Sequence, residues 1–193
     1  MIMLASGNEH KRRELQAILG VPIGIPKDRG LDFDPVEDGS SFLENALIKA
    51  RALHELTGEA VIADDSGICV DALGGAPGIH SARYGYAEGL ASNDAERNAL
   101  LLSRIEGQSN RKARFVCCMV LLLSHERFFV AQETFEGEIA PEASGGAGFG
   151  YDPLLHLPAH GCTVAELAED EKNRLSHRAK AARVLADIIR SAF

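Results

Sequence analysis

The segment from Val61 to Arg83 constrains the fold of this chain more than any other. Three apolar residues, Val61 to Ala63, indicate the start of a buried strand, and two adjacent carboxylates, Asp64 and Asp65, interrupt it. Burying two like charges side by side is costly unless a cation lies nearby. Because no His or Cys stands next to these acids, their oxygen ligands favour Mg²⁺ over Zn²⁺. A salt-bridged acidic turn at the end of a strand is the alternative explanation.

The geometry of a strand leaves two arrangements open for these acids. On a straight strand Asp64 and Asp65 point to opposite faces of the sheet. Either the strand ends there and both carboxylates converge on one metal, or only Asp65 faces the site. Ser66, Gly67 and the glycine-rich residues 74–78 follow, so the backbone could approach a ligand closely at this point.

Length and charge limit the classes of protein that the chain can represent. Its 193 residues predict a single domain over residues 1–193, organised as two lobes. The formal net charge of -8 argues against a nucleic-acid or membrane-surface binder, since both rely on a basic field. A small anion such as a free nucleotide stays possible, because it needs only a local cluster of cations.

The cysteines and the N-terminal segment predict a cytoplasmic location. The four cysteines show no Cys-x-x-Cys spacing and favour buried, reduced thiols in a reducing compartment. The first residues lack the basic region of a signal peptide. The longest apolar run, Phe115 to Leu123, is too short to cross a bilayer.

The N-terminal segment has the pattern of an anion-binding turn. Ile2 to Ala5 predicts a short buried strand, and Ser6 to Asn8 leads into a helix for which Asn8 is a suitable N-cap. Backbone N–H groups and the helix dipole favour an anion at such a start. Lys11 lies in the first turn, where the dipole disfavours a cation, so a bound phosphate would resolve the mismatch. A solvated surface charge paired with Glu14 is the alternative.

A second helix is predicted after an acidic segment. Val21 to Ile25 indicates a strand, and Ser41 with Glu44 forms a capping box that opens the helix. Lys49 lies off the apolar stripe of this helix. It is either an ordinary exposed lysine or a phosphate ligand that reaches toward the acids.

Three further elements are predicted in the second half of the chain. Asn93 caps a helix that runs to about Ile105. Residues 113–123 and 128–139 form a hairpin whose strands are buried on both faces over much of their length. Ser176 caps the last helix, whose apolar residues include Val184.

Two segments near the C-terminus carry residues suited to a nucleotide. In the glycine-rich segment 144–153, aromatic residues spaced by glycine could expose a flat face to a base, and Asp152 could accept hydrogen bonds from ring N–H groups. An ordinary loop is the alternative. His177 and Arg178 begin the last helix, where cations are disfavoured as at Lys11. One anion that bridges both helix starts would account for both.

The ordered set of these segments resembles the inosine triphosphate pyrophosphatase family, the non-canonical purine nucleoside triphosphate pyrophosphatases or XTP/dITP diphosphatases. The matching segments span nearly the whole chain and are Ser6–Lys11, Ser41–Ala46 with Lys49, Ala63–Gly67, Gly74–Arg83, Phe149–Pro153, and Lys172 with Ser176–Arg178.

The resemblance implies a fold and an activity. The fold is α/β, with an elongated central mixed sheet, helices in two lobes and a nucleotide-binding cleft between the lobes, and the protein is a homodimer. The activity is Mg²⁺-dependent hydrolysis of dITP, ITP and XTP to the monophosphate and pyrophosphate, which cleanses the nucleotide pool.

The resemblance also implies roles for individual residues. Asp65 matches the general base, and Lys11 and Lys49 complete the catalytic set. The metal ligands are Asp65, Asp64 and Glu37. The substrate-binding residues are Ser6, Gly7, Asn8, Glu9, His10, Lys11, Ser66, Phe149, Gly150, Tyr151, Asp152, Lys172, His177 and Arg178. The guanidinium of Arg178, which only donates hydrogen bonds, would favour the 6-oxo group of these purines over the amino group of adenine.

Two other functions remain compatible with the residues. One is a related pyrophosphatase that acts on a different modified or pyrimidine nucleotide. The other is a nucleotide sensor without catalysis, which would keep the cations but would not need a base poised beside a metal. The joint presence of Asp64, Asp65 and Lys49 favours an enzyme.

Overall fold

The computed structural model describes residues 1–192, which divide into two compact units. The first unit contains residues 1–65, 117–133 and 175 onward, and the second contains residues 66–116 and 134–174. The single domain predicted over residues 1–193 stays a prediction, and residue 193 lies outside the described residues. No helix of the described part of the chain combines the length and apolar composition needed to cross a membrane.

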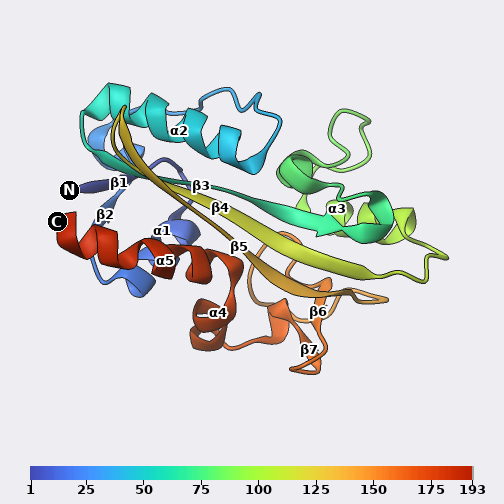
Figure 1. Ribbon diagram of the computed structural model, residues 1–193. Coiled ribbons are helices and arrows are strands. Elements are labelled where there is room, and N and C mark those ends of the chain that lie inside the picture. Colours follow the sequence, from blue (N-terminus) through green and yellow to red (C-terminus); the bar gives the residue numbers. More distant parts are fainter. Residues whose placement is uncertain (193) are drawn as a thin grey trace. The chain divides into compact units, whose positions relative to one another are not determined.

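Within residues 1–192, seven strands and five α-helices make up the fold (Figure 1). In chain order they are β1 (Ile2–Leu4), α1 (Glu9–Leu19), β2 (Ile23–Gly24), α2 (Phe42–Thr57), β3 (Ala60–Val70), α3 (Asp94–Arg104), β4 (Lys112–Ser124), β5 (Arg127–Ile139), β6 (Leu155–Leu157), β7 (Cys162–Thr163), α4 (Glu169–Leu175) and α5 (His177–Ala192). The strand order is β2-β1-β3-β4-β5-β6-β7. Strand β1 pairs in parallel with β2 and β3, whereas β6 pairs antiparallel with β5 and β7. The predicted α/β fold with a mixed sheet is confirmed.

The first unit has an apolar core on each face of its part of the sheet. Helices α1 and α5 cover one face and α2 covers the other (Figure 1). Along β3, Ile62 packs with the α1 and α5 side chains, while Val61 and Ala63 pack with the α2 side chains. This alternation has the two-residue period of a strand and sets the direction of the residues that follow.

The predicted helix starts are confirmed. Asn8 Oδ1 accepts from the N–H groups of His10 and Lys11, Ser41 Oγ accepts from Glu44 N, and Asn93 Oδ1 accepts from Glu96 N. The capping box predicted at Ser41 requires the Glu44 carboxylate to accept from Ser41 N. In the structure this carboxylate accepts from the N–H and hydroxyl groups of Ser40. These side chains occupy backbone donors that the first turn of a helix leaves unpaired.

Gly67, where the sequence indicated a close approach to a ligand, lies close to the backbone of its own unit. A Cβ on Gly67 would lie 2.2 Å from the carbonyl oxygen of Gly78 and 2.5 Å from the Ser81 hydroxyl. Ser81 Oγ in turn accepts from Ile68 N at 2.9 Å. Glycine at this position therefore lets β3 pack against the 3₁₀ helix Gly78–Arg83, which explains the residue without a ligand.

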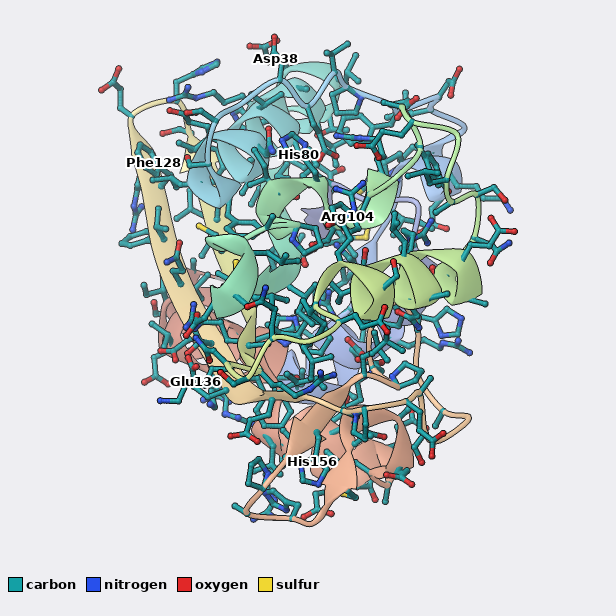
Figure 2. The ribbon with its side chains drawn as sticks, turned by 90° about the vertical axis from the view of Figure 1, so that its right-hand side faces the viewer. Asp38, His80, Arg104, Phe128, Glu136 and His156 are labelled. Carbon is teal, nitrogen blue, oxygen red and sulfur yellow. The ribbon has the colours of Figure 1, made fainter. Side chains whose placement is uncertain are left out.

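The burial predicted for both strands of the hairpin was wrong for one of them. Strand β4 is buried along nearly its whole length, but β5 alternates, and its Phe128 and Val130 are each 40% exposed. Figure 2 labels Phe128 near the turn of the hairpin. Val184 is 55% exposed on α5, whereas Ile189 is buried. Apolar residues in a run do not show which face of an element has a neighbour, so burial on both faces was overestimated.

We expect Ser41→Ala to lower the free energy of unfolding by about 1 kcal/mol, because it leaves the Glu44 N–H without its acceptor at the start of α2. Thermal denaturation would show a fall in Tm of about 2 to 4 °C. Ser191→Ala, at an exposed hydroxyl near the end of α5, is the control and should leave Tm unchanged. Equal Tm values for both variants would contradict this role of Ser41.

Candidate active site

Strand β3 runs through both acids and separates them. It extends from Ala60 to Val70 without interruption, so the second of the two arrangements left open by the sequence is the one observed. Asp64 points with Ile62 toward α1 and α5, and Asp65 points with Ala63 toward α2. The two adjacent carboxylates therefore lie in different environments.

Asp64 is held between two cations. Its Oδ1 lies 2.9 Å from Lys11 Nζ, and its Oδ2 accepts from Nε and Nη2 of Arg178 at 3.3 and 3.2 Å. Arg178 Nη1 also donates to Glu14 Oε2 at 2.7 Å. Asp64 and Arg178 are buried. An internal carboxylate thus bridges the cations at the starts of α1 and α5, and Glu14 pairs with Arg178.

These contacts keep Asp64 ionised. Burial disfavours its carboxylate, but the charges of Lys11 and Arg178 outweigh this effect and hold the pKa of Asp64 well below its usual range. Burial likewise disfavours the Arg178 cation, but Asp64 and Glu14 raise the pKa of Arg178 above its ordinary value. Asp64 and Arg178 consequently stabilise each other's charged forms.

Asp65 lies in a second cluster on the opposite face of β3. Its Oδ1 is 3.0 Å from Lys49 Nζ, which is also 3.3 Å from Glu37 Oε1. Asn45 Nδ2 donates to Asp65 Oδ2 at 3.5 Å, and Asn45 Oδ1 accepts from Gly39 N at 2.9 Å. The second link attaches the acidic segment to α2 and explains why Glu37 reaches Lys49.

Lys49 is buried, with 7% of its surface exposed, so it is not the ordinary exposed lysine that was one alternative. It lies four residues after Asn45, so the two side chains share a face of α2. Burial disfavours its ammonium, but Asp65, Asp64 and Glu37 outweigh this effect and raise the pKa of Lys49. No separate role was predicted for Asn45, although its spacing from Lys49 was a usable signal.

Asp65 differs from Asp64 in its proton affinity. Burial raises the pKa of Asp65, Lys49 opposes this, and the nearby charges of Glu37 and Asp64 add to the rise, so the pKa lies above its ordinary value. Two adjacent carboxylates whose pKa values are pushed in opposite directions are typical of a site in which one acid exchanges protons and the other stays charged.

The predicted metal ligands are Asp65, Asp64 and Glu37, and the structure shows how their oxygen atoms are arranged. Among residues 1–192 no group of three or more His, Cys, Asp or Glu side chains is arranged to hold a metal ion. Asp65 and Glu37 both approach Lys49, which places two oxygen donors near one position, and Mg²⁺ commonly binds one or two carboxylates together with water and phosphate oxygens. These two residues fit such an ion. Both oxygens of Asp64 are already bonded to cations.

The predicted phosphate cradle is a capped turn in the structure. Ser6 Oγ accepts from Asn8 N at 3.1 Å, and Asn8 Oδ1 accepts from His10 N and Lys11 N at 2.9 and 3.2 Å. Gly7 is exposed, and an added Cβ there would have no atom within 4 Å. The turn places the Lys11 side chain within hydrogen-bond distance of Asp64. Phosphate binding by residues 6–11 stays a prediction, because the Asn8 cap already occupies two of the N–H groups.

The segment Phe149–Asp152 of the second unit is anchored at successive residues. Asp152 Oδ2 accepts from Phe149 N at 2.9 Å and from Lys172 Nζ at 2.7 Å. The Tyr151 hydroxyl donates to Ser81 O at 2.9 Å, and the Tyr151 ring is buried. Phe149 is 37% exposed, with Lys172 Nζ 4.9 Å from its ring centroid. Of the two aromatic residues predicted to face a base, only Phe149 is exposed.

Two of the residues predicted to contact the substrate lie at the start of α5. Ser176 Oγ accepts from Ala179 N at 3.2 Å at the start of α5, where His177 is buried. A role of Arg178, His177, Asp152 or Ser66 in contacting the substrate stays a prediction. For Arg178 such a role competes with Asp64 and Glu14, which accept from three of its nitrogens.

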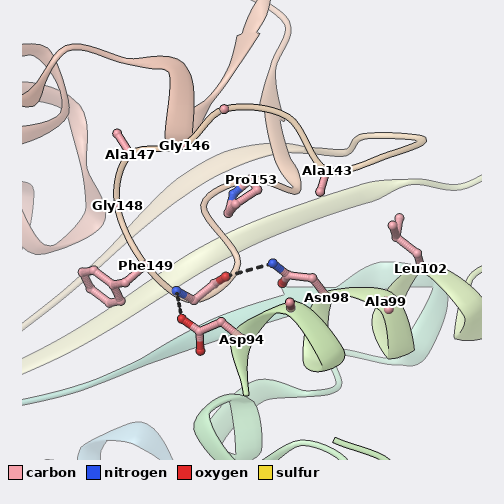
Figure 3. A pocket seen from close by; sticks show the side chains of 13 residues that line it. Asp94, Asn98, Ala99, Leu102, Ala143, Gly146, Ala147, Gly148, Phe149 and Pro153 are labelled. Carbon is pink, nitrogen blue, oxygen red and sulfur yellow. Dashed lines mark hydrogen bonds between the residues drawn. The ribbon is translucent and has the colours of Figure 1, made fainter. Parts of the chain in front are cut away.

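A cavity of about 470 Å³ lies between α3 and the glycine-rich loop of the second unit (Figure 3). Asp94 and Asn98 contribute polar side chains to its wall, and Ala99, Leu102 and Phe149 contribute apolar ones. The sequence prediction did not include the two polar residues. Their four-residue spacing on a capped helix was the only available signal.

The fold and the first-unit cluster define a class of protein: an α/β protein in which two adjacent acids of a central strand are each paired with a lysine. The chain belongs to the Ham1 family, whose model matches residues 2–188.

Similar proteins extend over almost the whole chain. It is 53% identical over 182 residues to the dITP/XTP pyrophosphatase of Treponema denticola, covering 93% of both chains. It is 46% identical to the dITP/XTP pyrophosphatase of Chromobacterium violaceum, covering 93% of this chain and 92% of that one. Among solved structures, the HAM1 protein from Coxiella burnetii matches with a TM-score of 0.90 and 38% identity, covering 98% of each chain.

We expect Asp64→Asn to lower the free energy of unfolding by about 3 kcal/mol, because it leaves buried Arg178 and Lys11 with a neutral partner. Since the folded pKa of Asp64 is depressed, its ionised form stabilises the protein above the unfolded pKa of about 3.9. This contribution is lost as the pH falls through the lower folded pKa. Urea denaturation at pH 7 and under acid conditions measures both effects.

Asp187→Asn is the matched control, because Asp187 forms an exposed pair with Arg190 on α5. It should change the unfolding free energy by less than about 0.5 kcal/mol. If Asp64→Asn unfolded at the same urea concentration as this control, the buried triad would not stabilise the first unit.

Proposed function

We propose that this protein hydrolyses the non-canonical purine nucleotides dITP, XTP and ITP to the monophosphate and pyrophosphate, with Asp65 as general base and Mg²⁺ as cofactor. The chain is a nucleoside triphosphate pyrophosphatase, since it belongs to the Ham1 family and its full-length relatives carry that activity in their names. The first two substrates come from those names. ITP follows from the chemistry, because it differs from dITP only by a ribose hydroxyl.

One observation carries the proposed mechanism: Asp65 is buried beside Lys49 and has a raised pKa, whereas the pKa of its neighbour Asp64 is held well below its usual range. A general base works best when its pKa lies closer to the working pH than that of an ordinary carboxylate. Lys11 and Arg178 stabilise the charge of Asp64 and lower its pKa, so Asp64 is a weak proton acceptor. Asp65 is therefore the acid of the pair that is suited to accept a proton.

The reaction needs a proton acceptor and charge neutralisation. Water attacks the α-phosphorus, the bond from this phosphorus to the oxygen that bridges it to the β-phosphorus breaks, and pyrophosphate leaves. Asp65 orients the water and takes its proton. Lys49, and Lys11 by exchanging its contact with Asp64, neutralise negative charge on the triphosphate. When bound, Mg²⁺ supplies further neutralisation of the phosphate oxygens, and Asp65 and Glu37 are the residues that would hold it.

Asp64 has a different role from the metal ligand that the family resemblance implied. Its contacts with Lys11 and Arg178 support a positioning role, in which it orients the two cations at the starts of α1 and α5. A direct bond from Asp64 to the metal would require one of these cations to leave. We therefore propose Asp65 and Glu37 as the metal ligands. Asp64 orients the Lys11 ammonium so that it can contact the phosphates.

The exposed ring of Phe149 supports base binding by the second unit. Its neighbours Gly150, Tyr151 and Asp152 are each hydrogen-bonded within the unit, so the ring projects from a fixed segment. Lys172, above the ring and bonded to Asp152, adds a donor suited to the 6-oxo group of hypoxanthine or xanthine.

We expect Asp65→Asn to abolish turnover of dITP, because the amide cannot accept the proton from water, while nucleotide binding is largely retained. Single-turnover assays with Mg²⁺ and a panel of dITP, XTP, ITP, dGTP, dATP and dTTP should identify pyrophosphate, and not orthophosphate, as the product of the wild type. Equilibrium binding of dITP to the variant separates chemistry from affinity. A variant that loses binding but keeps the wild-type rate at saturation would rule out this role.

We expect Phe149→Ala to raise KM for dITP about ten-fold with a smaller effect on kcat, because base stacking on an aromatic ring contributes about 1–3 kcal/mol. Phe128→Ala is the matched control, since Phe128 is similarly exposed but lies on β5 in the first unit. Steady-state kinetics with both variants test the assignment. An unchanged KM in Phe149→Ala would remove this ring from base binding.

The same panel distinguishes the other functions. Preferred hydrolysis of a pyrimidine triphosphate would indicate the related pyrophosphatase, and binding without product would indicate a sensor. A homodimer and a cytoplasmic location belong to the same proposal. Light scattering of the purified protein and cell fractionation test them.

A further inference from the structure

Helix α3 bonds to both backbone polar groups of one residue in the Phe149–Asp152 segment. Gly150 N donates to Asp94 Oδ2 at 2.7 Å, and Asn98 Nδ2 donates to Gly150 O at 3.1 Å (Figure 3). Asp94 and Asn98 are four residues apart and share a face of α3. Both backbone polar groups of Gly150 are thus bonded to side chains of a single helix, an arrangement that we call the Gly150 clamp.

The conformation of Gly150 needs such support. Its φ of 62° lies in the left-handed region, which glycine adopts freely but does not prefer strongly over other conformations. Without the clamp the peptide on either side of Gly150 could rotate. Phe149 and Tyr151 are its direct neighbours, so a rotation there would change the direction of the Phe149 ring.

Asn98 is a costly residue for this position. It is 7% exposed, and its Oδ1 has no hydrogen-bond partner within the described residues. A buried acceptor without a partner disfavours folding, so Asn98 is not explained by stability alone. Its Nδ2 supplies the donor that Gly150 O requires, and neither alanine nor leucine could replace that donor.

We propose that Asp94 and Asn98 are specificity-positioning residues that act through Gly150 on the base-contacting face of Phe149. This inference rests on the proposed function, because it takes Phe149 as the residue that stacks on the base. Tyr151 is fixed by Ser81 and Asp152 by Lys172, and Phe149 N donates to Asp152 Oδ2, so the clamp supplies the bonds of Gly150 between these fixed residues. The cavity beside the clamp leaves room for the loop to shift when a clamp bond is lost.

The test compares Asn98→Ala and Asp94→Ala with Asn93→Ala in the full-length protein. Asn93 caps α3 but does not contact Gly150, so its loss destabilises the same helix and leaves the clamp in place. Asp94→Asn is the conservative variant, because its amide oxygen can still accept from Gly150 N. Kinetics with dITP and dGTP, inhibition by inorganic tripolyphosphate and Tm are measured for each variant.

Loss of one clamp bond should raise KM for dITP about two- to ten-fold, the range of a typical hydrogen bond, with kcat within about two-fold of the wild type. The preference for dITP over dGTP should fall, and the inhibition constant of tripolyphosphate, which lacks a base, should not change. Asp94→Asn should restore most of the loss seen in Asp94→Ala. Asn93→Ala should lower Tm with a wild-type KM.

Two results would overturn the inference. One is that Asn93→Ala and Asn98→Ala have the same Tm and raise KM for dITP by the same factor. The other is a rise in the tripolyphosphate inhibition constant equal to the rise in KM, since the effect would then not concern the base. Failure of the proposed function itself would be visible separately, as absence of pyrophosphate release from dITP by the wild type.

Discussion

The alternation of side chains along β3 is the constraint on which the first unit depends. Successive residues of a strand face opposite sides of the sheet, so Asp64 and Asp65 cannot share one environment. Asp64 faces α1 and α5, where Lys11 and Arg178 keep it charged. Asp65 faces α2, where burial raises its pKa in spite of Lys49. Two identical neighbours in the sequence thereby acquire different chemistry.

The cost of burying charge connects this site to the stability of the fold. Helices α1 and α5 both begin with cations that their dipoles disfavour, and Asp64 compensates both. Lys49 is buried among carboxylates of β3 and of the acidic segment before α2. The residues that would bind a triphosphate are therefore already partnered within the protein. A bound polyphosphate would replace internal ion pairs, which limits the net gain from binding and favours selectivity over tight affinity.

The second unit fixes the Phe149–Asp152 segment through a network of backbone and side-chain hydrogen bonds that includes one ion pair, Asp152 with Lys172. Gly150 is bonded to α3, Tyr151 to Ser81, and Asp152 to Lys172 and to the N–H of Phe149. A short segment with a bond at each residue loses little conformational entropy when a ligand binds, because the loss has occurred on folding. Phe149 gains a fixed orientation from this network while its ring stays exposed.

Local sequence patterns determined the helix starts and the chemical character of the site. Asn8, Ser41 and Asn93 could be recognised because a cap bonds to residues two or three positions away, and the ordered motifs pointed to a nucleoside triphosphate pyrophosphatase. The faces of β3 and β5, the burial of Lys49, and the partners of Arg178 and Asn98 were decided only by the tertiary structure. Arg178 bonds to Asp64 across 114 positions of sequence and Asn98 to Gly150 across 52, and no periodicity encodes such pairings. Local hydrogen bonds can be predicted from neighbouring residues, because both partners lie within a few positions of each other. The environment of a buried charge depends on which distant elements pack against it.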